Sequence, residues 1–316
     1  MKHALRILGA VGAALALLVA GYVALNWAPD RTVEELRARW AAPPSEFIEL
    51  NGLRVHVRDE GRRDDPVPIV LLHGTSDSLH TWSGWVRALE KDRRVIRVDM
   101  PGFGLTGPTP DGDYSIEAYT RFAIAVLDHY GLDHSVLGGN SFGGWVAWET
   151  ALAAPGRVDA LVLVDAAGYA FESRSVPIGF RVAKIPVLNR LVDSVLPRSL
   201  VESSVRSVYG DPSRVTPELV DRYYELTLRE GNRAALVQRF SQAPLGLNES
   251  RIREVRVPTL ILWGGRDGLI PVEYGGLFNR DIAGSQLVVF DDLGHVPQEE
   301  DPARTVAAVR SFLAIP

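Results

Sequence analysis

The 316-residue chain contains no cysteine, which excludes disulfide bonds, thiolate chemistry and cysteine-ligated metal ions. It also has no long run of lysine and arginine, and its net charge of −5 argues against a nucleic-acid partner. The seven histidines are scattered, and none stands in a His-x-x-x-His or Glu-x-x-His pair with metal-ligand character. What remains is an ordinary globular composition, with 46% apolar and 23% charged residues.

The N-terminal segment differs from the rest of the chain. Two basic residues precede an uncharged stretch from Ile7 to Trp27, which is long enough to cross a bilayer as a helix. Tyr22 and Trp27 would then lie near the far interface. A cleaved signal peptide is the alternative, although the residues before Trp27 make a poor cleavage site. We therefore expect residues 1–29 to be a membrane anchor (or a signal sequence), with the following domain on the extracytoplasmic side; secretion after signal cleavage is the alternative.

Strand and helix patterns alternate after a charged, proline-containing linker at 30–45, in which a short helix is expected at 32–40. Such alternation predicts an α/β fold with a mainly parallel sheet covered by helices. The first two strands are expected to form an antiparallel pair around Asn51-Gly52. The expected strands are 47–50, 55–58, 68–72, 94–98, 135–138, 160–164, 259–263 and 286–290.

A long stretch without strand character follows the sixth expected strand. Several prolines divide it, and amphipathic helices are expected at 217–229 and 233–240. We interpret residues 170–250 as a helical lid inserted into a core formed by residues 46–169 and 251–316. An insertion that leaves and rejoins at a sheet edge can cover a site there.

A Gly-x-Ser-x-Gly motif occupies residues 139–143, between an expected strand and an expected helix. This spacing places Ser141 on a sharp strand-to-helix turn, with its hydroxyl projecting from the end of the sheet. Residues bulkier than glycine at 139 and 143 would clash with the neighbouring strand and helix. The amide of Phe142 would lie at a helix N-terminus, where developing negative charge is stabilised. Ser141 is therefore a candidate nucleophile, and the Phe142 N–H is a candidate oxyanion donor.

A serine hydroxyl needs a base, and the base needs an orienting group. His295 follows the last expected strand, and Asp267 follows the strand before it. The ends of parallel strands meet at one edge of a sheet, so these side chains can converge on Ser141. Their chain order of Ser, Asp, His is that of hydrolases with such a turn. We therefore predict His295 as the base and Asp267 as the acid that orients it.

The loop after the strand at 68–72 should supply the second oxyanion donor, because two backbone N–H groups are needed. It reads His73-Gly74-Thr75-Ser76, and the Thr75 N–H is the candidate. His73 could be mistaken for the catalytic base. At a strand end and before a glycine, it is better interpreted as a residue that shapes this loop.

Taken together, five motifs resemble the α/β-hydrolase superfamily, in particular serine esterases and lipases with a helical cap. The resemblance covers roughly residues 46–316 and implies a mostly parallel eight-stranded sheet flanked by helices. It also implies a triad of Ser141, His295 and Asp267, with Asp165 as the reserve acid because some relatives place the acid there. The motifs are His73-Gly74, Asp99–Gly104, Gly139–Gly144, Gly264–Asp267 and Gly294-His295 with the following Glu300–Pro302.

Serine at the nucleophile position is unlike haloalkane dehalogenases and epoxide hydrolases, which place aspartate there. A serine with an oxyanion hole suits hydrolysis of carboxylic esters through an acyl-enzyme, which needs no metal or organic cofactor. The apolar segment from Val176 to Leu196, packed over the triad, would favour a small hydrophobic ester met near a membrane.

Two other functions stay open. Carbon–carbon bond hydrolases of meta-cleavage products use the same triad, and their turn resembles Gly139–Gly144. They differ in a glycine- and proline-rich oxyanion loop, and in a tryptophan where this chain has Val296. We therefore rank ester hydrolysis first and carbon–carbon hydrolysis second. A non-catalytic ligand-binding homologue is the third function, and the apparently intact triad argues against it.

Overall fold

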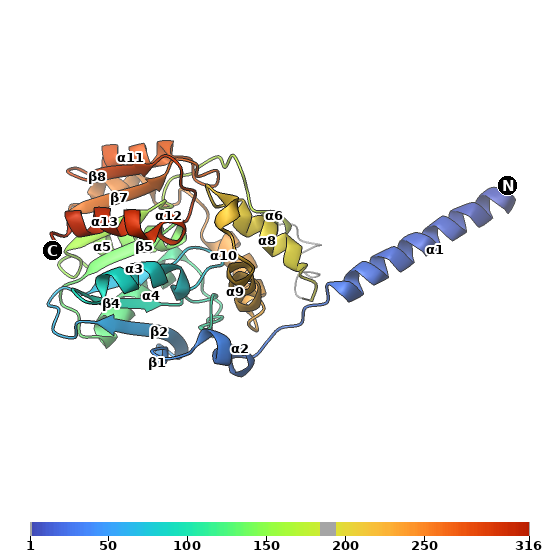
Figure 1. Ribbon diagram of the computed structural model, residues 1–316, viewed down its shortest axis with the longest axis horizontal. Helices are drawn as coiled ribbons and strands as arrows, with labels where there is room; N and C mark the ends of the chain where they lie inside the picture. Colours follow the sequence, from blue (N-terminus) through green and yellow to red (C-terminus); the bar gives the residue numbers. More distant parts are fainter. Residues whose placement is uncertain (1, 184–193, 316) are drawn as a thin grey trace.

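One eight-stranded sheet forms the centre of the structure, a computed structural model that describes residues 2–183 and 194–315 (Figure 1). The strands are β1 (Glu46–Leu50), β2 (Leu53–Gly61), β3 (Ile69–Leu72), β4 (Arg94–Val98), β5 (Val136–Asn140), β6 (Ala160–Val164), β7 (Thr259–Gly264) and β8 (Gln286–Phe290). Their spatial order is β1-β2-β4-β3-β5-β6-β7-β8. β2 pairs antiparallel with β1 and β4, and the remaining neighbours are parallel. The predicted α/β-hydrolase fold is confirmed, although β2 extends well beyond the expected 55–58.

Helices cover both faces of this sheet. The flanking helices are α3 (Ser83–Leu89), α4 (Ile116–His129), α5 (Phe142–Ala153), α11 (Glu273–Asp281), α12 (Pro297–Glu300) and α13 (Pro302–Phe312), with a 3-10 turn at Leu79–Trp82. Alternate residues of a strand point to opposite faces. Val70 and Leu72 of β3 accordingly join the apolar cluster under α4 and α5, whereas Ile69 and Leu71 join the cluster under α3 and α13. Strands buried on both faces explain the continuous apolar runs in the sequence.

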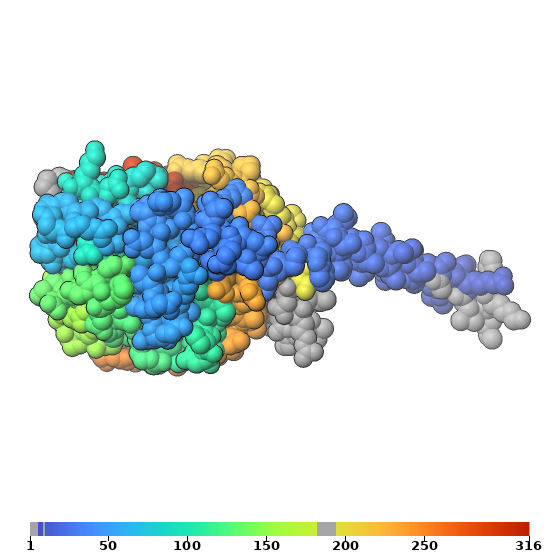
Figure 2. Space-filling view, turned by 90° about the horizontal axis from the view of Figure 1, so that it is seen from below, coloured from blue at the N-terminus to red at the C-terminus, as the bar shows by residue number. Residues whose placement is uncertain are grey.

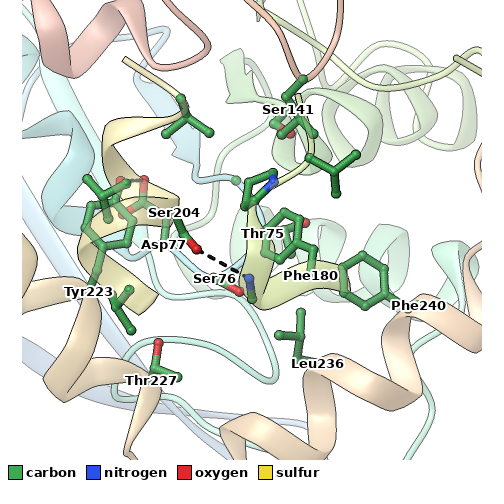
Figure 3. Close-up of a pocket in the computed structure, with 18 of the residues that line it drawn as sticks. Thr75, Ser76, Asp77, Ser141, Phe180, Ser204, Tyr223, Thr227, Leu236 and Phe240 are labelled. Atoms are coloured by element: carbon green, nitrogen blue, oxygen red, sulfur yellow. Dashed lines mark hydrogen bonds between the residues drawn. The ribbon is translucent and has the colours of Figure 1, made fainter. Parts of the chain in front are cut away.

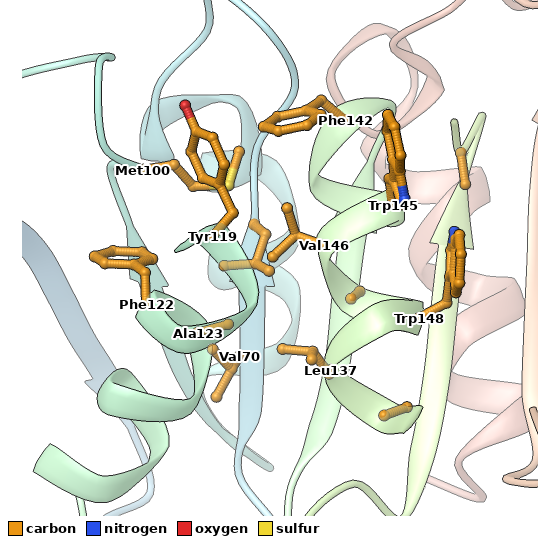
Figure 4. Close-up of a cluster of buried hydrophobic side chains, with 14 of the residues drawn as sticks. Val70, Met100, Tyr119, Phe122, Ala123, Leu137, Phe142, Trp145, Val146 and Trp148 are labelled. Atoms are coloured by element: carbon orange, nitrogen blue, oxygen red, sulfur yellow. The ribbon is translucent and has the colours of Figure 1, made fainter. Parts of the chain in front are cut away.

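Aromatic side chains fill the layer between β3, β5 and the helices α4 and α5 (Figure 4). Trp145 and Trp148 on α5 are fully buried there, and Tyr119 on α4 packs edge-to-face on Phe142 with ring centroids 4.7 Å apart. Burial of rings of this size contributes on the order of 2–3 kcal/mol each. This packing fixes α5, and with it the turn that carries Ser141.

The chain forms further helices between β6 and β7 in the sequence, and these helices gather at one end of the sheet (Figure 1). They are α6 (Ile178–Ala183), α8 (Arg198–Arg206), α9 (Pro217–Thr227) and α10 (Asn232–Gln242), with 3-10 turns at Pro212–Arg214 and Glu249–Glu254. α9 and α10 match the expected amphipathic helices to within two residues. Residues 184–193 of the apolar segment at 176–196 lie outside the described residues. Apolar side chains of α8, α9 and the adjoining loops form a small core of their own, in which Leu196, Val201 and Val205 are buried.

Helix α1 (Lys2–Leu25) projects away from the rounded body of the protein (Figure 2). Its Arg6–Leu25 span is the one helix of the described chain that is long and apolar enough to cross a membrane, and by those criteria it fits a signal sequence as well.

The segment between α1 and β1, which includes the end of the 1–29 segment and the linker at 30–45, is docked rather than free. The Ala28 N–H donates to Ser194 O (2.9 Å), and the Leu196 N–H donates to Asn26 O (3.1 Å). The expected short helix is present as α2 (Val33–Trp40), where Arg39 Nη1 lies 2.7 Å from Glu225 Oε1 of α9. The linker is therefore tied to the inserted helices.

Candidate active site

Ser141 occupies the sharp turn between β5 and α5, with φ 54° and ψ −118°. The two glycines of the motif are required by space. A Cβ at Gly139 would lie 2.2 Å from Gly143 O, and one at Gly143 would lie 2.4 Å from Leu72 O of β3. Strained backbone of this kind persists only where the surroundings hold it, and here the Ser141 N–H donates to Val164 O of β6 (2.9 Å).

His295 and Asp267 meet as the sequence predicts. Nδ1 of His295 lies 2.6 Å from Oδ2 of Asp267, and both side chains are buried. The other oxygen of Asp267 accepts hydrogen bonds from the amides of Leu269 (2.8 Å) and Ile270 (2.9 Å). These three contacts fix the orientation of the carboxylate beside the imidazole. Asp267 can therefore hold the imidazole with a proton on Nδ1 and leave Nε2 free to act as a base.

Ser141 and His295 line the same cavity. Within the described part of the chain, Ser141 Oγ makes no hydrogen bond to His295, and such pairs are often poorly aligned before a substrate binds. Asn140 joins the two segments, because its Nδ2 donates to the backbone oxygen of His295 (3.0 Å). The sequence analysis missed this role of Asn140, although it is the second residue of the Gly-x-Ser-x-Gly motif.

Asp165, the reserve acid, lies beside the predicted pair. It is fully buried, it has a φ of 43°, and its Oδ1 accepts from the Gly264 N–H (2.9 Å). One donor atom from each of Asp165, Asp267 and His295 lies within 4.8 Å of the others. Burial and the neighbouring charge of Asp267 raise the pKa of Asp165 well above its ordinary value. Burial and the neighbouring carboxylate thus favour the protonated form of Asp165, which leaves Asp267 as the partner of His295.

The same three side chains have the spacing of a metal site. The short contact between His295 Nδ1 and Asp267 is the contact of a hydrogen bond, which engages the nitrogen that would otherwise bind the ion. The raised pKa of Asp165 also disfavours the carboxylate form that a metal ligand needs. The donor set thus fits the orienting pair of a hydrolase better than it fits a metal centre.

The loop after β3 runs directly beside the nucleophile. A Cβ at Gly74 would lie 3.3 Å from Cβ of Ser141, and Thr75 lines the cavity next to it. His73 Nδ1 lies 2.7 Å from Gly74 O, and its Nε2 accepts from the Met100 N–H (2.9 Å). Burial lowers the pKa of His73, so that the ring is neutral and shapes the loop as expected. The Thr75 and Phe142 N–H groups remain the candidate oxyanion donors.

The cavity above Ser141 has a volume of about 810 Å³ and a mostly apolar lining. Figure 3 shows Ser141 and Thr75 facing the same space as Phe180, Leu236 and Phe240 of the inserted helices. Val19, Tyr22 and Val23 of α1 also line it. A cavity of this size holds a ligand of several carbon atoms.

A buried charge network closes one side of the cavity. Arg222 of α9 lies 2.6 Å from Glu299 and 3.5 Å from Asp77, and the Tyr223 hydroxyl lies 3.0 Å from Asp77 Oδ2 and 3.1 Å from Glu299 Oε2, so that it can donate to either carboxylate. Burial raises the pKa of Asp77 to about 7. The network ties the oxyanion loop, α9 and α12 together. No local sequence motif predicts this charge network, because its members come from three distant segments.

Comparisons with known proteins agree with this geometry. The family model of the alpha/beta hydrolase fold matches residues 67–302. A 2-hydroxy-6-oxo-2,4-heptadienoate hydrolase of Pseudomonas putida strain F1 is 32% identical over 282 residues, 85% of this chain and 95% of the relative. A 2-hydroxymuconate semialdehyde hydrolase of Pseudomonas sp. strain CF600 is 31% identical over 83% of this chain and 91% of the relative.

A solved structure is similar along most of the chain as well. The meta-cleavage product hydrolase CumD of Pseudomonas fluorescens IP01 superposes with a TM-score of 0.73 and 27% identity, covering 85% of this chain and 97% of its own. The strand order, the turn at Ser141 and the match of the family model over most of the chain lead to one assignment. The chain belongs to the α/β-hydrolase family and is a hydrolase.

Proposed function

We propose that Ser141 is the nucleophile of this hydrolase, with His295 as its base and Asp267 as the acid that orients the base. One observation carries the proposal: Ser141 stands on a strained turn in a cavity shared with His295, whose Nδ1 lies 2.6 Å from Asp267. The Phe142 and Thr75 N–H groups are proposed to hold the oxyanion.

The bond that breaks is proposed to be the carbon–carbon bond beside a carbonyl group of a conjugated oxo acid, because the similar proteins are hydrolases of a 6-oxo-dienoate and of a semialdehyde. The sequence analysis ranked this reaction second. Its two objections concern the oxyanion loop and Val296, which adjoin the triad without belonging to it. The likeness to the dienoate hydrolases extends over more than four fifths of the chain, and it outweighs those two local differences.

In this reaction Ser141 Oγ bonds to the carbonyl carbon while His295 takes the hydroxyl proton. When the adduct collapses, the electron pair of the broken carbon–carbon bond passes to the conjugated fragment, and the leaving carbon takes the proton from His295. His295 then removes a proton from water, which releases the acyl group from Ser141 as a carboxylic acid. Asp267 keeps the imidazole in one tautomer throughout.

Ester hydrolysis is the second candidate, and one specific observation favours it. The cavity lining is mostly apolar and includes Val19, Tyr22 and Val23 of the apolar helix α1. A membrane anchor at the cavity would bring a hydrophobic ester to Ser141. In this version residues 1–29 are the anchor, and residues 170–250 act as a lid over the site.

Two substrates tested on the full-length protein separate the candidates. Turnover of a 2-hydroxy-6-oxo-dienoate at a rate well above that of p-nitrophenyl hexanoate supports carbon–carbon hydrolysis, and the reverse order supports ester hydrolysis. The Ser141→Ala variant should lose on the order of 10⁴-fold or more in kcat on either substrate. If the wild-type protein turns over neither substrate and the alanine variant binds the same ligands equally well, the chain is a binding protein.

A further inference from the structure

Arg239 of α10 has an unusual position among the charged residues. Its side chain lines the cavity that holds Ser141, and only 4% of the residue is exposed. The guanidinium carbon lies 4.6 Å from the centre of the Phe142 ring and 4.3 Å from that of Phe240. Phe142 is the residue next to the proposed nucleophile, so this cation stands close to the reacting centre.

No carboxylate neutralises Arg239 within the described residues. The contrast with two other buried arginines is direct: Arg222 is paired with Glu299 and Asp77, and Arg233 with Asp30. Nε of Arg239 has no hydrogen-bond partner among the described atoms, but the same is true of Nε of Arg222, so the missing carboxylate is what sets Arg239 apart. Burial lowers the pKa of Arg239 to about 10, so the group still carries its charge at neutral pH.

A buried cation is costly unless a counter-charge accompanies it. The two aromatic rings offset part of that cost by facing the guanidinium. Aromatic rings accept no strong hydrogen bond, so they do not supply the partner that Nε of Arg239 lacks. The remaining partner must come from the cavity, and it must be an acceptor that bears negative charge.

We propose that Arg239 is a substrate-binding residue that pairs with a carboxylate group of the substrate. The planar fork of a guanidinium matches a carboxylate in a bidentate pair, which favours this anion over others. The inference rests on the proposed function and adds the class of substrate: an acyl compound that is apolar along most of its length and carries one carboxylate. A dienoate satisfies this description, and so does a monoester of a dicarboxylic acid.

The kinetic test uses two esters that differ by one charged group: p-nitrophenyl hexanoate and the mono-p-nitrophenyl ester of adipic acid. In the full-length protein, Arg239→Gln should lower kcat/KM for the adipate monoester on the order of 10- to 100-fold. The hexanoate ester should be nearly unaffected, and Arg239→Lys should restore part of the loss. Arg87→Gln, which removes an exposed arginine on α3, is the matched control and should change neither ester.

A binding test keeps this inference separate from the proposed reaction. Thermal unfolding of the Ser141→Ala protein is followed with hexanoate, with hexanamide and with inorganic phosphate. Hexanoate alone should raise Tm, and the added Arg239→Gln change should abolish the rise. Equal shifts with hexanoate and hexanamide, or an equal loss of kcat/KM on both esters, would show that Arg239 is structural. A larger shift with phosphate would replace the carboxylate with a phosphorylated ligand.

Discussion

Replacing Asp267 and Asp165 one at a time tests which of two neighbouring carboxyl groups orients His295. In Asp267→Asn the amide presents N–H groups to His295 Nδ1, where the carboxylate Oδ2 now lies 2.6 Å away. The imidazole then keeps its proton on Nε2 and cannot accept one from Ser141. This tautomer exchange should lower kcat by about 10³- to 10⁴-fold, or about 4–5.5 kcal/mol of transition-state stabilisation.

Asp165→Asn should behave very differently. Asparagine resembles a protonated aspartic acid, because its Oδ1 can still accept from the Gly264 N–H and its amide is a neutral group that carries a donor. We therefore expect kcat to change by less than about 10-fold. Asp165→Ala, by contrast, removes the acceptor at 2.9 Å and leaves the buried Gly264 N–H unsatisfied, which costs about 1–3 kcal/mol of unfolding free energy.

Steady-state kinetics on a p-nitrophenyl ester, or on the dienoate if esters are not turned over, measures the first two effects. Thermal unfolding measures the third. The reasoning fails if Asp165→Asn costs as much kcat as Asp267→Asn, because Asp165 would then be the orienting acid. It also fails if Asp267→Asn retains most of the wild-type rate.

Three further predictions follow from the site and its surroundings. Gly143→Ala places a Cβ 2.4 Å from Leu72 O, so we expect this variant to lose activity and about 1–3 kcal/mol of unfolding free energy. Steady-state kinetics and thermal unfolding measure the two effects, and an unchanged kcat would refute the steric argument. The folded pKa of Asp77 is raised, so this residue lowers stability as pH rises from 3.8 to about 7. Asp77→Asn should therefore flatten the dependence of Tm on pH over that range, and an unaltered slope contradicts the shift. Deletion of residues 2–25 should move the protein from the membrane fraction to the soluble fraction. If N-terminal sequencing shows that the wild-type protein already lacks these residues, the segment is a cleaved signal instead.

Much of the fold could be predicted because its determinants are local in sequence. The strand runs are apolar on both faces, and the turn at Ser141 carries glycines at the two positions where a side chain would collide with the backbone. His295 and Asp267 could be placed because both follow strands that are neighbours in the parallel sheet. The rule that parallel strand ends share one edge turns separate sequence positions into one location.

The features that were missed depend on contacts between the inserted helices and the rest of the molecule. Arg239 and Arg222 are ordinary arginines on amphipathic helices, and nothing in their neighbours indicates that one is paired and the other is not. The linker at 30–45 was expected to contain a short helix, but its ion pair with α9 was not foreseen, nor were the bonds that join Asn26 and Ala28 to segments near residue 195. No periodicity encodes such contacts, because they depend on how the inserted helices settle on the sheet edge.

The groups at the strand ends and the groups on the inserted helices are positioned by different contacts. The groups proposed to act on the carbonyl come from strand ends and their loops, whose positions are fixed by backbone pairing across the sheet. The groups that line the cavity come largely from α6, α8, α9, α10 and α1. Of these helices, α8 and α9 pack through a small apolar core of their own, and α9 also forms ion pairs with α2. A substitution on α10 can change the charge in the cavity without disturbing the pair formed by His295 and Asp267. If Ser141 is the nucleophile as proposed, we expect changes in these helices to alter which carbonyl compound reaches it, and changes at the strand ends to alter whether it reacts at all.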